Sequence, residues 1–154
     1  MRVVVALGGN ALLRRGEQVR EQVHLQHLAE AVETLAALQD AGLEVAVVTN
    51  LTTRIQMKKI EALGIGDHVD LVLTSEETGR EKPSSVMFTL PMAQLDVKPS
   101  ETVMVGDSVS SDIEGGNALG LTTVLFNNDA TGLDHREQPD HRIESFREVT
   151  EVVL

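Results

Sequence analysis

The stretch Val103-Met104-Val105-Gly106-Asp107-Ser108, followed by Asp112, carries the pattern that decides the fold. Its unbroken apolar run is typical of a strand that is buried on both faces of a sheet. The polar turn leads into apolar residues at helical spacing over residues 109–119, and Gly120 follows as a left-handed C′ residue would. We therefore expect a buried strand, a polar turn and a helix, in that order.

The same unit recurs along the whole chain. The sequence predicts strands over residues 3–7, 44–48, 69–73, 102–105 and 122–126, with a short edge strand at 141–143. It predicts helices over residues 25–38, 52–63, 84–95, 109–119 and 146–153, and Pro91 predicts a kink or a break near Met87. Strands that alternate with helices indicate an α/β fold: a three-layer, Rossmann-like parallel sheet of five or six strands with helices on both faces.

Composition excludes several classes of function. A length of 154 residues argues for one domain over residues 1–154, and 13 basic against 24 acidic residues give a net charge of −11, which disfavours nucleic acid as a partner. Aromatic residues are 2 % of the chain, so base stacking is nearly excluded, and the absence of cysteine removes disulfides and thiolate chemistry. Because no apolar run approaches the ~18 residues of a membrane span, we expect a cytoplasmic protein with no membrane partner.

Polar residues follow the predicted strands, where the sites of parallel sheets lie. Thr49 and Asn50 can donate hydrogen bonds to phosphoryl oxygens, and Lys82 can neutralise the charge on them. Asp107 and Asp112 can supply oxygen ligands for Mg²⁺. The sequence thus predicts a site for a phosphate and a hard cation.

Each of these residues also has a purely structural interpretation. Asn50 or Thr52 could cap the helix that follows, and Lys82 could be a solvated loop lysine. Asp112 could be a first-turn acid that the helix dipole favours. Occurring together, in order and at strand ends, they favour the functional interpretation.

Over residues 35–127 the chain resembles the haloacid dehalogenase-like superfamily of Mg²⁺-dependent phosphohydrolases. The resemblance is carried by Val47-Val48-Thr49-Asn50, by Lys82-Pro83 and by the stretch from Val103 to Asp112. It implies a Rossmann-like domain that hydrolyses a small phosphorylated metabolite. By the same resemblance Thr49 would bind the transferred phosphoryl group, Lys82 would steady it, and Asp107 with Asp112 would serve the metal.

The first strand departs from this family. Members end it with two aspartates, one residue apart, that act as nucleophile and as general acid and base. Alignment puts Ala6 and Gly8 at these positions, and neither can attack phosphorus or transfer a proton. Loss of a covalent nucleophile typically costs ~10⁴- to 10⁶-fold in turnover. The chain is therefore expected to be a poor phosphatase or none.

The N-terminal segment has a second resemblance, over residues 4–17, to the opening of carbamate kinase and its amino-acid-kinase relatives. There Gly8, Gly9 and Asn10 would present backbone N–H groups to a phosphoryl group. Residues 1–42 are thus atypical, and because the linker before Thr49 holds only one helix, we expect no cap domain. An open rim suits a large phosphorylated partner, or shielding by a second subunit in a homo-oligomer.

Three functions stay open at this point. The first is a Mg²⁺-dependent phosphate-monoester hydrolase. The second is a non-catalytic member of the same family, a pseudoenzyme that binds phosphate or Mg²⁺ or regulates a partner. The third is a fragment of a kinase-like acyl-phosphate enzyme, against which the length argues.

Overall fold

A computed structural model describes residues 4–8 and 21–154 of the chain. The strands are β1 (Val4–Gly8), β2 (Glu44–Thr49), β3 (Leu71–Thr74), β4 (Thr102–Gly106), β5 (Thr122–Phe126) and β6 (His141–Ile143). The helices are α1 (Glu21–Asp40), α2 (Thr53–Leu63), α3 (Ser75–Thr78), α4 (Val86–Gln94), α5 (Glu114–Ala118) and α6 (Val149–Val153). Short turns lie at η1 (Gly66–His68), η2 (Pro99–Glu101), η3 (Val109–Ile113) and η4 (Phe146–Glu148).

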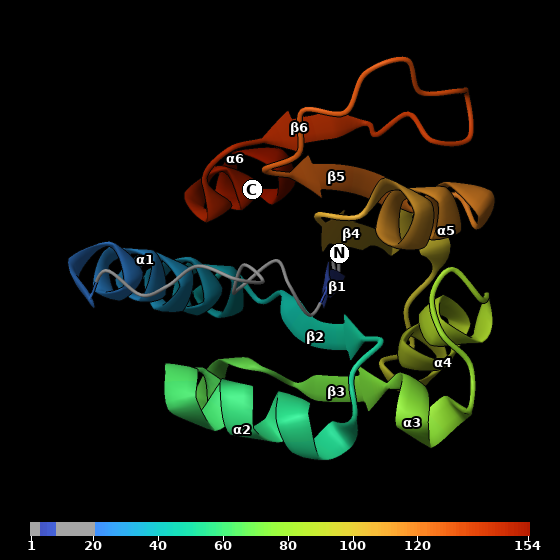
Figure 1. Cartoon of the computed structure of the whole chain (residues 1–154). Helices are drawn as coiled ribbons and strands as arrows, with labels where there is room; N and C mark the ends of the chain where they lie inside the picture. The colour runs from blue at the N-terminus through green and yellow to red at the C-terminus, as the bar shows by residue number, and fades with distance from the viewer. Residues whose placement is uncertain (1–3, 9–20) are drawn as a thin grey trace.

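The strands pair in parallel in the order β3-β2-β1-β4-β5-β6. Strands β2 and β3 form a pair, β4, β5 and β6 form a group of three, and β1 joins the two groups (Figure 1). The predicted α/β fold with a parallel sheet is confirmed. The atypical first strand lies at the centre, between β2 and β4.

Alternation along the strands divides the core between the two faces of the sheet. On one face Val45 and Val103 belong to a buried cluster with Leu35 and Leu38 of α1. On the other face Ala46, Val48 and Met104 form a cluster with three residues of α4, namely Met87, Phe88 and Met92. Burying each large side chain contributes about 1.5–3 kcal/mol. Helices therefore cover both faces of the sheet, as predicted.

Several local features differ from those predicted. The expected break near Met87 does not occur: α4 runs without interruption from Val86 to Gln94 with Pro91 inside it. Pro91 lacks only the one N–H that would bond to the Met87 carbonyl, and burial of Met87, Phe88 and Met92 holds the helix together. The third strand begins at Leu71, two residues later than predicted, because Val69 is the C-cap of η1 and Asp70 lies between η1 and the strand. The helix expected over 109–119 is a π-helical turn, η3, followed by α5.

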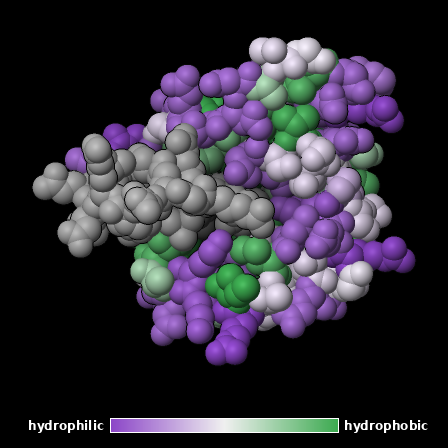
Figure 2. Space-filling view, in the orientation of Figure 1, coloured by the Kyte–Doolittle hydropathy of each residue, from purple (hydrophilic) through white to green (hydrophobic). Residues whose placement is uncertain are grey.

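The outer surface is mainly hydrophilic on the face that Figure 2 shows, in keeping with the net charge of −11. Among the residues whose burial the structure describes, the exposed large hydrophobic ones are Ile55, Met57 and Leu154. Within residues 4–8 and 21–154, no helix is both long and apolar enough to cross a membrane.

Helix α5 packs closely because two of its residues lack side chains. A Cβ at Gly115 would lie 2.5 Å from the Phe88 ring, and one at Gly116 would lie 2.7 Å from Cγ2 of Thr123. Both distances are shorter than carbon atoms tolerate. The two glycines thus allow α5 to lie directly against α4 and β5.

We predict that Gly116→Ala destabilises the fold by about 1–3 kcal/mol, because the methyl group overlaps a fully buried Thr123 side chain. Gly66→Ala is the matched control, since its Cβ would meet Ile60 at an ordinary 3.8 Å, and it should change stability by less than about 0.5 kcal/mol. Urea unfolding of both variants measures the difference. Equal effects would contradict the close approach of α5.

Candidate functional site at the carboxyl edge of the sheet

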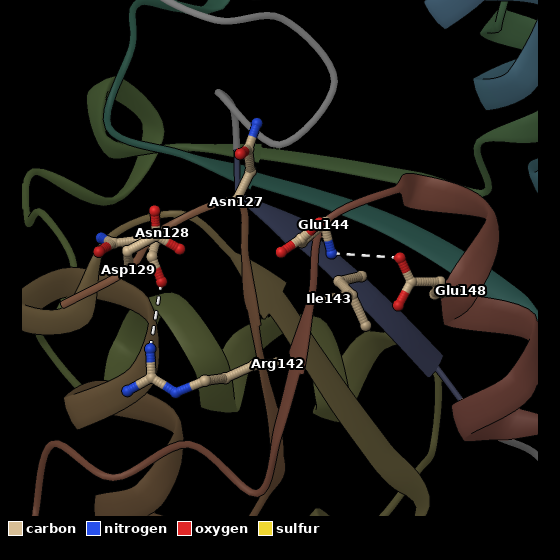
Figure 3. Close-up of a pocket in the computed structure, with 7 residues that line it drawn as sticks. All are labelled: Asn127, Asn128, Asp129, Arg142, Ile143, Glu144 and Glu148. Atoms are coloured by element: carbon tan, nitrogen blue, oxygen red, sulfur yellow. Dashed lines mark hydrogen bonds between the residues drawn. The ribbon is translucent and has the colours of Figure 1, made fainter. Parts of the chain in front are cut away.

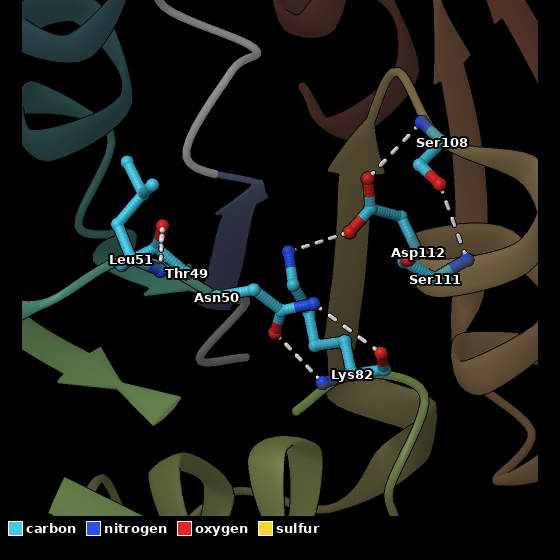
Figure 4. A network of polar contacts seen from close by, with 7 residues as sticks. All are labelled: Thr49, Asn50, Leu51, Lys82, Ser108, Ser111 and Asp112. Carbon is cyan, nitrogen blue, oxygen red and sulfur yellow. Dashed lines mark hydrogen bonds and ion pairs between the residues drawn. The ribbon is translucent and has the colours of Figure 1, made fainter. Parts of the chain in front are cut away.

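A buried ion pair lies at the carboxyl edge of the sheet (Figure 4). Nζ of Lys82 donates to Oδ1 of Asp112 at 2.6 Å, and the two side chains are 5 % and 2 % exposed. An ammonium so deeply buried is costly unless a carboxylate accompanies it. Lys82 is therefore not the solvated loop lysine of the structural interpretation.

Asp112 is held by the turn that follows β4. Its Oδ2 accepts a hydrogen bond from the Ser108 backbone N–H at 3.2 Å, while Ser108 Oγ accepts one from Ser111 N at 3.2 Å. A Cβ on Gly106 would overlap the Asp112 carboxylate, so only glycine fits there. The π-helical turn η3 carries Asp112, and such turns are frequent at functional sites. Both carboxylate oxygens of Asp112 are thus engaged.

Asn50 holds the main chain of Lys82. The Lys82 N–H donates to Oδ1 of Asn50 at 2.7 Å, and Nδ2 of Asn50 donates to the Lys82 carbonyl at 3.3 Å. Because Asn50 directly follows β2, this pairing fixes the Lys82 loop to the edge of the sheet. Asn50 is therefore not a cap of α2, and the Thr52 side chain makes no capping hydrogen bond either.

Thr49 and Asp107 complete the edge. Thr49 is 1 % exposed, and its Oγ1 accepts a hydrogen bond from Leu51 N at 3.3 Å, which leaves the hydroxyl proton to donate. Asp107 is half-buried, and its carbonyl accepts a hydrogen bond from Nδ2 of Asn128 at 2.8 Å. These residues end β2 and follow β4, the two strands on either side of β1.

The register of β1 places its last residue close to this network. Gly8 pairs with Val48, one residue before Thr49. Ala6 pairs with Ala46 and Met104, so it lies three residues, or about 10 Å, further from the edge than Thr49. Gly9 and Asn10 lie outside the described residues, so the phosphate-binding role expected of the glycines stays a prediction.

The structure thus joins Asn50, Lys82 and Asp112 directly and puts Thr49 and Asp107 on the same edge. Their roles toward phosphate and metal stay predictions. Two further residues shape the site without having been predicted to do so: Ser108 donates to Asp112, and Gly106 leaves room for its carboxylate. The position of Ser108 just before the helical turn is a signal that could indicate its role, since short polar residues there commonly bond to the next turn.

A cavity of about 300 Å³ lies further along the edge, where β5 and β6 end (Figure 3). It is lined by Asn127, Asn128, Asp129, Arg142, Ile143, Glu144 and Glu148. Arg142 donates to the carbonyls of Asn128 and Ala130, at 3.1 and 2.9 Å. Glu148 accepts from the backbone N–H groups of Glu144 and Ser145. The charged side chains that line this cavity therefore hold the surrounding loops in place.

Of the two aspartates predicted to serve the metal, Asp112 does not suit a resident Mg²⁺ ion, while the role of Asp107 stays a prediction. Magnesium takes oxygen ligands in near-octahedral geometry. The oxygens of Asp112 serve the Lys82 ammonium and the Ser108 N–H, and an ammonium 2.6 Å away repels a cation. Strand β1 supplies no carboxylate at Ala6 or Gly8. Among the described residues, no group of three or more His, Cys, Asp or Glu side chains is arranged to hold a metal.

Comparison with known proteins gives a consistent result. The family model of haloacid dehalogenase-like hydrolases matches residues 10–126. A ribulose-1,5-bisphosphate 5-phosphatase from Halopiger xanaduensis is 55 % identical over 132 residues, which are 80 % of this chain and 55 % of the relative. A glyceraldehyde 3-phosphate phosphatase from Methanocaldococcus jannaschii is 34 % identical over 130 residues, 84 % of this chain and 57 % of the relative.

A solved structure shows the same fold. A HAD-type hydrolase from Bacillus subtilis, bound to magnesium, superimposes with a TM-score of 0.74 at 17 % identity and covers 98 % of both chains. The chain spans little more than half the length of the two curated relatives described above. The resemblance to carbamate kinase finds no support in these comparisons, and residues 9–17 of that segment lie outside the described residues.

The buried ion pair gives a stability prediction. Asp112→Asn leaves the Lys82 ammonium buried without a counter-charge and should cost about 3 kcal/mol or more. Adding Lys82→Met removes the stranded charge and should recover part of that loss. Urea unfolding of the two single variants and the double variant measures the coupling. A coupling below about 0.5 kcal/mol would show that the pair does not interact in solution.

Asn50 gives a second prediction. Asn50→Leu removes both hydrogen bonds to the Lys82 main chain, which strands its buried polar groups, and should destabilise the fold by about 1–3 kcal/mol. Asn50→Asp keeps an acceptor for the Lys82 N–H and should cost less. Gln94→Leu, at an exposed position of α4, is the matched control and should change little. Thermal unfolding measures the difference. If Asn50→Leu unfolds at the same temperature as the control, the hydrogen bonds of Asn50 to Lys82 do not stabilise the fold.

Proposed function

Because the chain belongs to the haloacid dehalogenase-like hydrolase family, we propose that its carboxyl edge binds the phosphoryl group of a small phosphorylated metabolite. The buried Lys82–Asp112 pair carries this proposal. A lysine ammonium has three N–H donors, and Asp112 takes one of them. The other two suit phosphoryl oxygens, which form strong charge-assisted hydrogen bonds.

Neighbouring residues supply further donors. The Thr49 Oγ1 already accepts a hydrogen bond from Leu51 N, so its hydroxyl proton can be donated to a phosphoryl oxygen. Asn50 acts through Lys82 by fixing its main chain, so it is a positioning residue in this proposal. Preorganised donors of this kind stabilise charge that develops during phosphoryl transfer.

Hydrolysis by this chain is proposed to be slow. Covalent phosphoryl transfer requires a nucleophile at the end of β1, and Ala6 and Gly8 provide none, so water would have to attack phosphorus directly. No step is assigned to Mg²⁺, because both Asp112 oxygens already accept hydrogen bonds, from Lys82 and from Ser108. The second candidate function, a non-catalytic phosphate-binding protein, is favoured by the same two residues.

The substrate class is narrowed by the relatives. The two curated relatives described above are phosphatases of ribulose 1,5-bisphosphate and of glyceraldehyde 3-phosphate. We therefore propose phosphorylated sugars as the first ligands to examine.

The test is turnover of an aryl phosphate, in the presence of Mg²⁺, by the full chain and by variants. We expect the parent to be slow and Ala6→Asp with Gly8→Asp to be at least ~100-fold faster, because a carboxylate nucleophile is restored. Gly8→Asp alone shows whether the position nearer the edge suffices. Asp134→Asn, in an exposed loop, is the control for Asp107→Asn.

Two outcomes would overturn parts of this proposal. Fast turnover by the parent that Asp107→Asn abolishes would show that no aspartate on β1 is needed. If neither phosphate nor sugar phosphates bind to the parent or to any variant, the proposed function is wrong.

A further inference from the structure

Helix α2 is positively charged although the protein as a whole is acidic. Its three basic residues and one acidic residue give it a net charge of +2, whereas the whole chain has −11. Gln56 and Ile60 form the buried side of the helix. The helical period places Arg54 and Lys58 on the opposite side, and both are exposed. The positive charge of α2 therefore faces solvent.

The outward side of α2 also exposes two large apolar side chains. Ile55 and Met57 are 48 % and 49 % exposed. Because they are two residues apart, they lie on opposite flanks of this side, with Arg54 and Lys58 between them around the helix. Methionine and arginine are enriched at protein interfaces. The helix thus offers a partner both apolar area and charge.

An acidic segment adjoins this helix. Residues 75–81 comprise α3 and the three residues after it, and their three acidic residues and one basic residue give a net charge of −2. Oε2 of Glu76 accepts a hydrogen bond from the Thr53 N–H at 2.8 Å, so α3 lies beside the start of α2 (Figure 1). Glu76, Glu77 and Glu81 are exposed. A basic and an acidic surface are therefore neighbours.

These opposite charges are not paired with each other inside one molecule. Among residues 4–8 and 21–154, no ion pair involves α2 or residues 75–81. A partner that complements this surface needs an acidic area opposite α2 and a basic area opposite residues 75–81. A second copy of the chain supplies both areas in the arrangement required.

We propose that two copies of the chain associate about a twofold axis through this surface, with α2 of each copy against residues 75–81 of the other. In a twofold contact the same patch serves on both subunits, so the patch must be complementary to itself. The paired charges set the orientation, and Ile55 and Met57 contribute apolar area. The contact borders the site, because Glu81 directly precedes Lys82.

Sedimentation equilibrium of the full chain measures the association. We expect the parent to be dimeric at about 100 μM, as is typical of a small reversible contact. Arg54→Glu with Lys58→Glu places acidic surfaces against each other and should weaken the dimer at least about tenfold. Lys98→Glu with Arg136→Glu is the matched control, since it changes the net charge equally at exposed positions outside α2 and residues 75–81. It should leave the dissociation constant unchanged.

The strongest test is a mixture of two charge-reversed variants. Glu76→Lys with Glu81→Lys places basic surfaces against each other and should also dimerise weakly by itself. Mixed with the variant of Arg54 and Lys58, it should form a heterodimer, because both contacts of the mixed pair then join opposite charges. Contacts through any other surface do not predict this recovery.

A further variant tests the apolar part of the contact. Ile55→Gln with Met57→Gln changes no charge and should weaken the dimer of the parent. Circular dichroism establishes that each variant is folded, since Glu76→Lys loses the hydrogen bond to Thr53. If that variant does not fold, the apolar variant and the variant of Arg54 and Lys58 decide, because both keep this hydrogen bond.

The outcomes that contradict the proposal are distinct from those that concern phosphate. A parent that stays monomeric at about 500 μM overturns it. So does a dimer that persists unchanged when Arg54 and Lys58 are replaced by glutamate, because the copies then meet elsewhere. Both results leave the proposed function standing, since it rests on Lys82, Asp112 and Thr49.

Discussion

The ion pair between Lys82 and Asp112 is the interaction on which the carboxyl edge depends. A buried pair stabilises a protein only when further hydrogen bonds satisfy both partners, because the cost of dehydrating two charges is large. Here Asn50 fixes the main chain of the lysine, and Ser108 donates to the carboxylate. The contacts run from the end of β2 to the end of β4 and so span β1, the strand between them. The geometry of the site therefore depends on β1, β2 and β4 together.

Much of the fold could be predicted from the sequence, because its determinants are local. Runs such as Val103-Met104-Val105 indicate strands buried on both faces, and the helical stripe through Leu35 and Leu38 indicates a helix against the sheet. The features that could not be predicted depend on tertiary contacts. Pro91 lies inside α4 because the buried residues around it stabilise the helix, and the π-helical turn η3 brings the Asp112 carboxylate against Ser108. Spacing alone carries no signal for either.

The candidate site could be predicted in its residue types and in its place at the strand ends. Parallel strands bring those ends together, so their order along the chain is enough to group Thr49, Lys82 and Asp107. What could not be predicted is which partner each group binds. An amide such as Asn50 can bind a ligand or a backbone equally well, and only the geometry shows that it binds Lys82. Likewise, the sequence does not indicate that the Asp112 oxygens accept hydrogen bonds from protein donors.

The outermost strand, β6, has only three residues, yet a short series of hydrogen bonds connects it to the site. Arg142 of β6 donates to the carbonyls of Asn128 and Ala130, and the amide of Asn128 donates to the carbonyl of Asp107. Short strands at the edge of a sheet, with few buried contacts, are among the first parts to open by local unfolding. Each opening of β6 releases the loop that restrains Asp107. The lifetime of the correctly formed turn after β4 is therefore limited by the stability of a strand at the periphery of the sheet.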